Sequence, residues 1–129
     1  MAGPGEAERR MAEPLLAALP GAKDLVGNLP IPESAALLSR AGLFVGNDSG
    51  LMHLSAAAGA PTLGLFGPTP ASQYAPIGRR ALAVLAKGPP GETPMVRLSV
   101  ADALAAAKRV LAMAERPDHA AALAATDRA

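Results

Sequence analysis

The feature that most constrains this chain is a polar, glycine-containing turn between a short apolar segment and an alanine-rich one. Residues 43–45 are apolar and predict a short buried strand, whereas residues 51–58 have the length and composition of a packed helix. The turn between them reads Gly-Asn-Asp-Ser-Gly. In open α/β sheets such a turn lies where free N–H groups and the helix dipole attract anions. We therefore predict that a phosphorylated ligand binds there.

The composition fits helices packed on a sheet. The 129 residues are enough for one domain that folds alone. Large aromatic side chains are scarce, with two Phe, one Tyr and no Trp, so the core must be built from Leu, Val and Ala. Such a core requires a close approach between backbones, which helices covering a sheet provide.

Charge and cysteine content exclude several classes of function. The net charge is +1 and no basic stripe with interleaved aromatics occurs, so nucleic acid is not an expected partner. The absence of cysteine excludes disulfides and thiolate metal sites and fits a reducing compartment. No apolar run reaches the roughly 20 residues of a transmembrane helix. The expected location is the cytoplasm.

Strand-like and helix-like segments alternate along the chain, which predicts right-handed crossovers and a parallel sheet. The predicted strands are residues 24–26, 43–45, 62–66 and 81–86. The expected fold class is thus α/β, a Rossmann-like open parallel sheet of about four strands with flanking helices.

The helices carry recognisable start signals. A helix over residues 6–19 contains Pro14, which should kink or split it. Pro32 suits the first turn of a second helix. Ser99 and Asp102 form a capping pattern for the last helix. The apolar stripe expected on that helix consists of Val100, Leu104, Ala107, Val110 and Leu111.

No internal repeat marks a domain boundary. We expect one partial domain over residues 1–117 and an alanine-rich tail over residues 118–129. Residues 1–6 look like the turn that follows a strand, although no strand precedes them, and four strands are fewer than the usual five or six. The sequence therefore suggests a fragment, or one half of a larger protein.

The turn residues suit a diphosphate. Gly50 would let the backbone approach phosphate oxygens, with the N–H groups of Ser49, Gly50 and Leu51 as donors. His53 could donate a ring N–H and stabilise charge on a leaving diphosphate. Asp48 would repel phosphates, so it is better suited to accept turn N–H groups, to orient His53 or to bind a sugar hydroxyl.

Simpler structural interpretations exist for the same residues. Helix capping alone explains one of the three polar turn residues. A lone histidine on an alanine-rich helix is more often packed than ligand-binding, His119 has no such context, and Met52 is expected in the core. Residues 66–69, Phe-Gly-Pro-Thr, can be a plain turn, although its position would bring Thr69 beside the same crevice.

Four motifs carry a resemblance to a known family. They are the Asp48-Ser49-Gly50 turn with His53, the alanine-rich helix after it, Gly59-Ala60-Pro61-Thr62, and Phe66-Gly67-Pro68-Thr69. In this order and spacing they closely resemble the C-terminal domain of bacterial ADP-heptose:lipopolysaccharide heptosyltransferases, glycosyltransferase family 9. The first residues, Gly3-Pro4-Gly5-Glu6, look like that family's Gly-Gly-Pro-x-Glu turn.

The resemblance implies the C-terminal, donor-binding half of a GT-B enzyme made of two Rossmann-like halves. It implies an ADP-heptose-like nucleotide sugar as ligand, with Glu6 accepting from the ribose hydroxyls. The acceptor and the catalytic base are expected from an N-terminal half, a separate acceptor domain or a second subunit, so no catalytic residue is assigned in this chain. No metal site or other cofactor is expected. The substrate-binding candidates are Glu6, Asp48, Ser49, Gly50, Leu51, His53 and Thr69.

Two functions remain open from the sequence. The first is the donor-binding portion of an inverting, heptosyltransferase-like glycosyltransferase in lipopolysaccharide core or related glycan synthesis. The second is a non-catalytic nucleotide-binding or interaction domain, a truncated relative without transfer activity.

Overall fold

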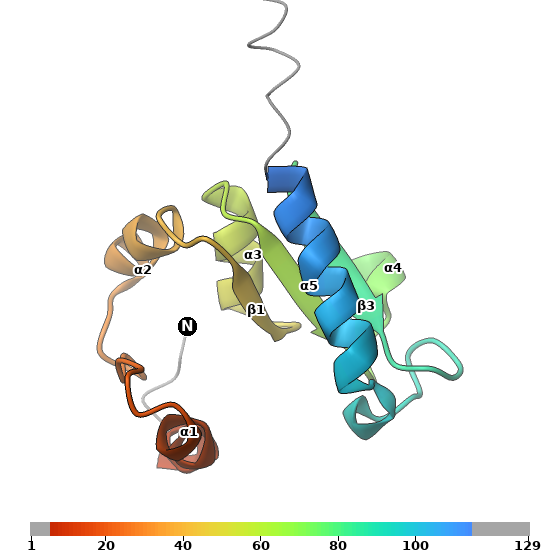
Figure 1. Ribbon diagram of the computed structural model, residues 1–129, viewed down its shortest axis with the longest axis horizontal. Coiled ribbons are helices and arrows are strands. Elements are labelled where there is room, and N and C mark those ends of the chain that lie inside the picture. Colours follow the sequence, from red (N-terminus) through yellow and green to blue (C-terminus); the bar gives the residue numbers. More distant parts are fainter. Residues whose placement is uncertain (1–5, 115–129) are drawn as a thin grey trace, which may run out of the picture.

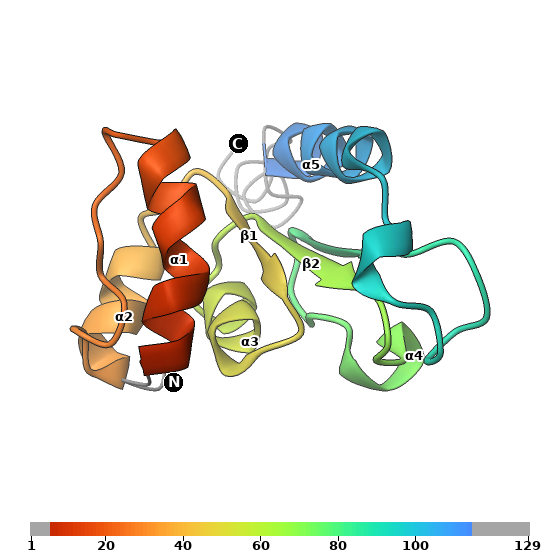
Figure 2. The same ribbon diagram turned by 90° about the horizontal axis from the view of Figure 1, so that it is seen from below.

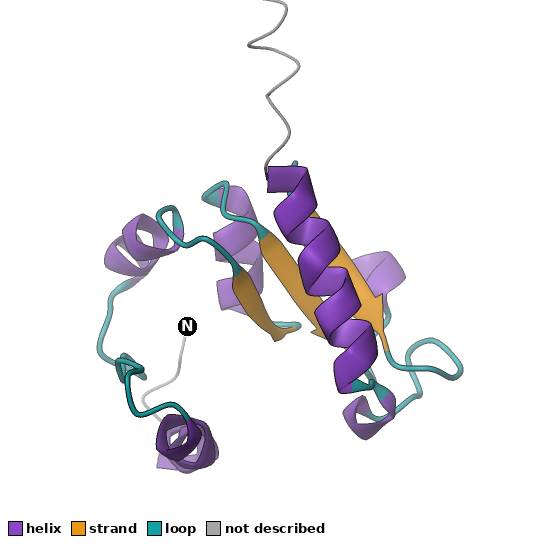
Figure 3. Ribbon diagram, viewed as in Figure 1, coloured by secondary structure: helices purple, strands orange, loops and turns teal. Residues whose placement is uncertain are grey.

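The computed structural model describes residues 6–114 and shows an open parallel sheet with helices around it (Figures 1 and 3). The strands lie in the order β1 (Phe44–Asn47), β2 (Thr62–Phe66), β3 (Ala81–Leu85). The helices are α1 (Glu6–Ala18), α2 (Ile31–Leu38), α3 (Gly50–Ala57), α4 (Ala71–Tyr74), the 3-10 turn η1 (Met95–Arg97) and α5 (Val100–Ala114). The predicted α/β, Rossmann-like class is confirmed.

The sheet separates two helical layers. Figure 2 shows α3 on one face and α5 on the other, while α1 and α2 lie beyond the β1 edge. On β2, alternate side chains point to opposite faces, as strand geometry requires. Leu63 packs against Ala106 and Val110 of α5, whereas Thr62 contacts α3. The central strand is buried on both faces, as is typical of parallel sheets.

A buried polar contact and an apolar one fix α3 to the sheet. The hydroxyls of Ser55 and Thr62 lie 2.9 Å apart, and Thr62 also donates to the Ala60 carbonyl. Met52 is fully buried on the same side of the helix, as the sequence predicted. Because every buried hydroxyl in this contact has a partner, α3 is held in one position against β2.

The fourth expected strand, at residues 24–26, is wrong. This segment is a turn, in which the Asp24 carboxylate accepts a hydrogen bond of 3.0 Å from the Val26 N–H. Gly27 follows with φ of 70°, a left-handed conformation that ends any extended run. The side chain and the glycine together favour a local turn over pairing with β1.

Two helix expectations are also corrected. Of the kink or split expected at Pro14, the split is wrong, because α1 runs through Pro14 as one helix. On α5, the stripe is wrong in part, because Val100 and Leu104 are more than half exposed, Leu111 is 40% exposed, and Ala106 is buried instead. Only the part of α5 that faces β2 and β3 is covered. The tail at residues 118–129 lies outside the described residues.

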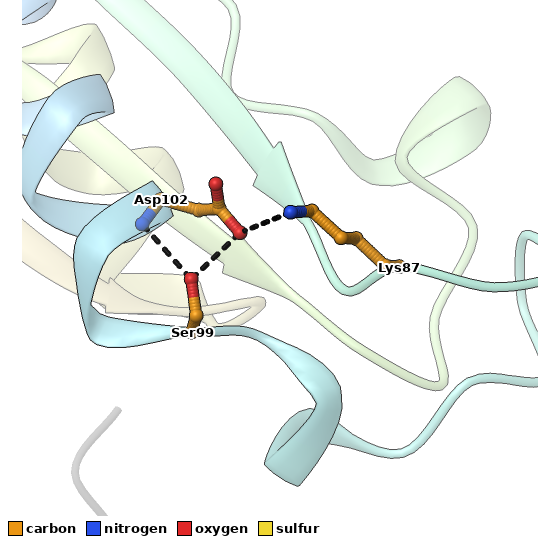
Figure 4. Close-up of polar contacts among 3 residues, drawn as sticks. All are labelled: Lys87, Ser99 and Asp102. Carbon is orange, nitrogen blue, oxygen red and sulfur yellow. Dashed lines mark hydrogen bonds and ion pairs between the residues drawn. The ribbon is translucent and has the colours of Figure 1, made fainter.

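The start of α5 is tied to the loop after β3 (Figure 4). Ser99 accepts a 3.0 Å hydrogen bond from the Asp102 N–H and donates a 2.7 Å bond to the Asp102 carboxylate, the capping arrangement that the sequence predicted. The ammonium of Lys87 lies 3.2 Å from the same carboxylate. The Ser99 hydroxyl first, and then Lys87, lower the pKa of the Asp102 carboxyl below its usual value of 3.8.

This pKa shift predicts an acid-dependent stability difference. A carboxyl group whose pKa is lowered by folding stabilises the folded state above its unfolded pKa and loses that contribution as the pH falls through its folded pKa. We expect Asp102→Asn to lower the melting temperature at pH 7 and to match the wild type near pH 2. Thermal unfolding followed by circular dichroism across this range checks it. A difference that is equal at both pH values would contradict it.

Candidate functional site

The turn between β1 and α3 leaves the start of the helix open. β1 ends at Asn47, and Ser49 is the N-cap residue of α3, with an extended backbone (φ −159°, ψ 164°). Ser49 and Gly50 are both exposed. The first turn of α3 therefore faces outward at the carboxyl end of a parallel strand, which is where ligands bind in open α/β sheets.

Ser49 satisfies one of the free amides of this helix end. Its Oγ accepts a 3.3 Å hydrogen bond from the Met52 N–H. Within residues 6–114, the N–H groups of Gly50 and Leu51 have no protein partner, because the first turn of a helix offers no carbonyl to them. The Ser49 hydroxyl accepts through a lone pair, so its own hydrogen stays available for donation. Three donors thus converge on the mouth of α3.

Asp48 and His53 flank these donors and face each other. The His53 Nε2 and Asp48 Oδ1 atoms lie 3.6 Å apart, so the two form an ion pair when the imidazole is protonated. The His53 side chain is 46% exposed and that of Asp48 is 19% exposed. His53 is therefore not a core residue, in contrast to its neighbour Met52. The ligand-binding role of both residues stays a prediction.

The structure does not join the remaining two candidates to this cluster. Glu6 is the first residue of α1 instead of the end of a strand, and its carboxylate binds Arg10 at 2.9 Å. Figure 1 shows α1 well apart from the sheet. Thr69 is half-buried in the loop after β2. Because β1 and β2 are parallel, this loop lies at the same end of the sheet as the turn after β1. The Gly3-Pro4-Gly5 turn and His119 lie outside the described residues.

An apolar pocket beside α3 was missed from the sequence. It encloses about 770 Å³, open solvent at its mouth included, between α2, α3 and the segment before α2. Its lining residues are mostly leucines, namely Leu25, Gly27, Leu29, Ile31, Ser34, Leu37, Leu38, Leu51 and Leu54. These residues come from three segments and share no single periodicity. Leu51 belongs to both the pocket and the first turn of α3, so the pocket and the amide cluster are neighbours.

The described residues contain neither a metal-binding cluster nor a membrane-spanning helix. Between residues 6 and 114, no three His, Asp or Glu side chains gather closely enough to hold a metal ion. In the same part of the chain, every helix is too short or too polar to be a membrane span.

Comparison with known proteins identifies the family. The sequence profile of glycosyltransferase family 9 (heptosyltransferase) matches residues 1–124. The chain belongs to glycosyltransferase family 9. The resemblance predicted from the four motifs is thereby confirmed.

One curated protein is similar over part of the chain. Lipooligosaccharide heptosyltransferase 2 from Haemophilus influenzae is 42% identical over 53 residues, which are 41% of this chain and 15% of that protein. The chain therefore spans only a small part of this relative. No solved structure matches the chain significantly.

Proposed function

We propose that the chain is the donor-binding portion of a heptosyltransferase-like glycosyltransferase with a GT-B arrangement. The observation that carries the proposal is the open mouth of α3, where the N–H groups of Gly50 and Leu51 and the hydroxyl of Ser49 converge. Helix N-termini of this kind hold phosphate oxygens without a metal ion. Membership of family 9 supports a nucleotide sugar as the ligand.

The pocket beside α3 supports the nucleoside end of the same ligand. In a nucleotide sugar, an aromatic base with apolar faces is joined through ribose and a diphosphate to the sugar that is transferred. With the diphosphate at the mouth of α3, the base can enter the leucine-lined pocket that shares Leu51 with this site. Pockets for such ligands are mostly apolar, with few polar groups. The proposed ligand class is an ADP-heptose-like donor, in keeping with the family.

In the proposed reaction, the donor loses its sugar to an acceptor with inversion at the anomeric carbon. An acceptor hydroxyl loses its proton to a base and forms the new bond to the anomeric carbon, while the bond between the sugar and the diphosphate breaks and negative charge grows on the leaving diphosphate. The amides of Gly50 and Leu51 and a ring N–H of His53 stabilise this charge, because donors that are already in place need no rearrangement as the charge grows. The acceptor and its base come from an N-terminal acceptor domain or a second subunit. A role in lipopolysaccharide core or related glycan synthesis and a cytoplasmic setting complete the proposal.

The first test is the affinity for ADP. We expect ADP to bind below millimolar, measured by isothermal titration calorimetry, with UDP and GDP for comparison. His53→Ala should weaken ADP binding at least about tenfold, because a hydrogen bond to a charged group contributes about 1.5–3 kcal/mol. Its melting temperature should be close to that of the wild type, since His53 is half exposed.

His119→Ala is the matched control, because it removes the other histidine of the sequence, outside the described residues. It should leave the ADP affinity unchanged. Equal ADP affinity of His53→Ala and the wild type, with a large loss of thermal stability, would assign His53 to packing. Failure of all three nucleotides to bind below millimolar would refute the donor site itself.

A second candidate is a nucleotide-binding domain without transfer activity. It rests on the same open helix end and needs no acceptor half. Mixing the chain with a separately produced acceptor half and assaying sugar transfer distinguishes the two. Turnover supports the enzyme, whereas ADP binding without turnover supports the binding domain.

A further inference from the structure

A carboxylate stands beside the proposed diphosphate site, where it should repel the ligand. Asp48 directly precedes the N-cap Ser49, at the mouth of α3. Like charges in proximity disfavour each other, so a bare carboxylate here would oppose the attraction of the helix amides. The position of Asp48 therefore requires an explanation that goes beyond helix capping, which Ser49 already performs.

The contacts of Asp48 distinguish between its possible uses. Within the described part of the chain, no backbone N–H of the turn donates to its carboxylate. Its contact is the 3.6 Å approach of Oδ1 to His53 Nε2, and four-fifths of its side chain is shielded from solvent. The carboxylate thus faces the imidazole, on the short connection between β1 and α3.

This contact has two consequences for His53. It holds one ring nitrogen, which restricts the rotation of a half-exposed side chain and leaves Nδ1 without a partner among residues 6–114. It also balances the charge of the carboxylate whenever the imidazole is protonated. A balanced and oriented pair no longer repels a diphosphate, and it presents the second ring N–H for donation.

We propose that Asp48 is a positioning residue that acts on the diphosphate through His53. This inference rests on the proposed donor site and deepens it. Removal of the Asp48 charge should then weaken diphosphate binding only while His53 is present. Without His53, the carboxylate is an uncompensated negative charge, and its removal should leave binding unchanged or strengthen it.

A double-mutant cycle on the 129-residue chain tests this coupling, with ADP as the probe. The four proteins are the wild type, Asp48→Asn, His53→Ala and the double variant. Asp48→Asn alone should weaken ADP binding about five- to tenfold, within the range of coupling between contacting residues. In the His53→Ala background, the same change should alter ADP affinity less than about twofold or increase it.

Two further variants make the result independent of folding. Asp48→Ser also removes the charge and keeps a residue type that suits the turn before a helix. It should lose ADP affinity as Asp48→Asn does, and it replaces that variant if Asp48→Asn is poorly folded. Asp48→Glu retains the charge and should restore part of the ADP affinity that Asp48→Ser loses. A residue that merely supports the turn would show no such rescue by charge.

The outcomes separate the inference from the proposed function. If the wild type binds no ADP, the donor site fails and the inference fails with it. If His53→Ala weakens binding but Asp48→Asn has the same effect with and without His53, the donor site stands and the positioning role is overturned. If Asp48→Asn weakens binding only in the presence of His53, Asp48 acts through the imidazole.

Discussion

Replacing Gly67 with alanine should lower the free energy of unfolding by about 2 kcal/mol, the usual cost of forcing an extra carbon into a packed interior. Gly67 follows β2 and is buried. A Cβ atom at this position would lie 2.7 Å from the Met95 nitrogen and 2.8 Å from its Cα. Both are backbone atoms, so no side-chain rotation relieves the overlap. The loops after β2 and β3 would have to move apart. Urea unfolding followed by circular dichroism measures the loss.

Gly42→Ala is the matched control for this prediction. A Cβ at Gly42 meets no atom within 4 Å, and its φ is not positive. Alanine there should leave the stability unchanged or raise it slightly, because it reduces the conformational freedom of the unfolded chain. Equal unfolding free energies of the Gly67 and Gly42 variants would show that the two loops are not in close contact.

The Gly67 prediction also concerns the family motif that contains it. Phe66 is buried in the core, and Gly67 permits the contact between the two loops. These two residues of the Phe-Gly-Pro-Thr motif thus have structural roles, and only Thr69 is left as a candidate for ligand contact. The plainer interpretation of this motif from the sequence is supported for its first half.

Local signals predicted the centre of the fold well. The strand expected at residues 62–66 is β2 with the same bounds, and the helix expected at residues 51–58 begins one residue earlier at Gly50. Gly59, with φ of 84°, follows that helix as a glycine stop signal should. Here the chemistry of a few adjacent residues decides the structure, so it can be read from them.

Contacts between distant segments could not be predicted in this way. The sequence gives Val100 and Leu104 the spacing of a buried stripe, but whether a stripe is covered depends on where the sheet ends. In the structure α5 packs on β2 and β3, and Val100 and Leu104 remain outside this contact. The leucine-lined pocket could not be predicted either, because its walls come from three segments that only the tertiary fold brings together.

The candidate site contains one feature that adjacent residues determine and one that depends on distant segments. The open amides of Gly50 and Leu51 follow from the order of strand, turn and helix, which the sequence makes plain. The resemblance predicts a turn at Glu6, but in the structure Glu6 begins a helix and binds Arg10. The position of the amides was therefore easier to predict than that of Glu6, and the ligand contacts of both remain predictions.

Gly50→Val should reduce the affinity for ADP by more than about tenfold, because the charge-assisted hydrogen bonds at risk contribute about 1.5–3 kcal/mol each. Gly50 is the first residue of α3 and is exposed, and its N–H and that of Leu51 are the proposed phosphate donors. A branched side chain on this residue occupies the space through which the phosphate approaches. Calorimetric titration with ADP measures the loss, and thermal unfolding measures the stability of the variant.

Ala57→Val separates a local effect from a general effect on the helix. Ala57 is the exposed last residue of α3, so valine there has the same modest helix propensity but lies at the opposite end from the amides. The ADP affinity of this variant should equal that of the wild type. If both valine variants bind ADP equally well, the phosphate does not sit on the α3 amides. If both lose affinity to the same extent, the whole helix has been disturbed and the effect at Gly50 is not specific. A loss confined to Gly50→Val, together with a normal melting temperature, is the result that a diphosphate at this helix end requires.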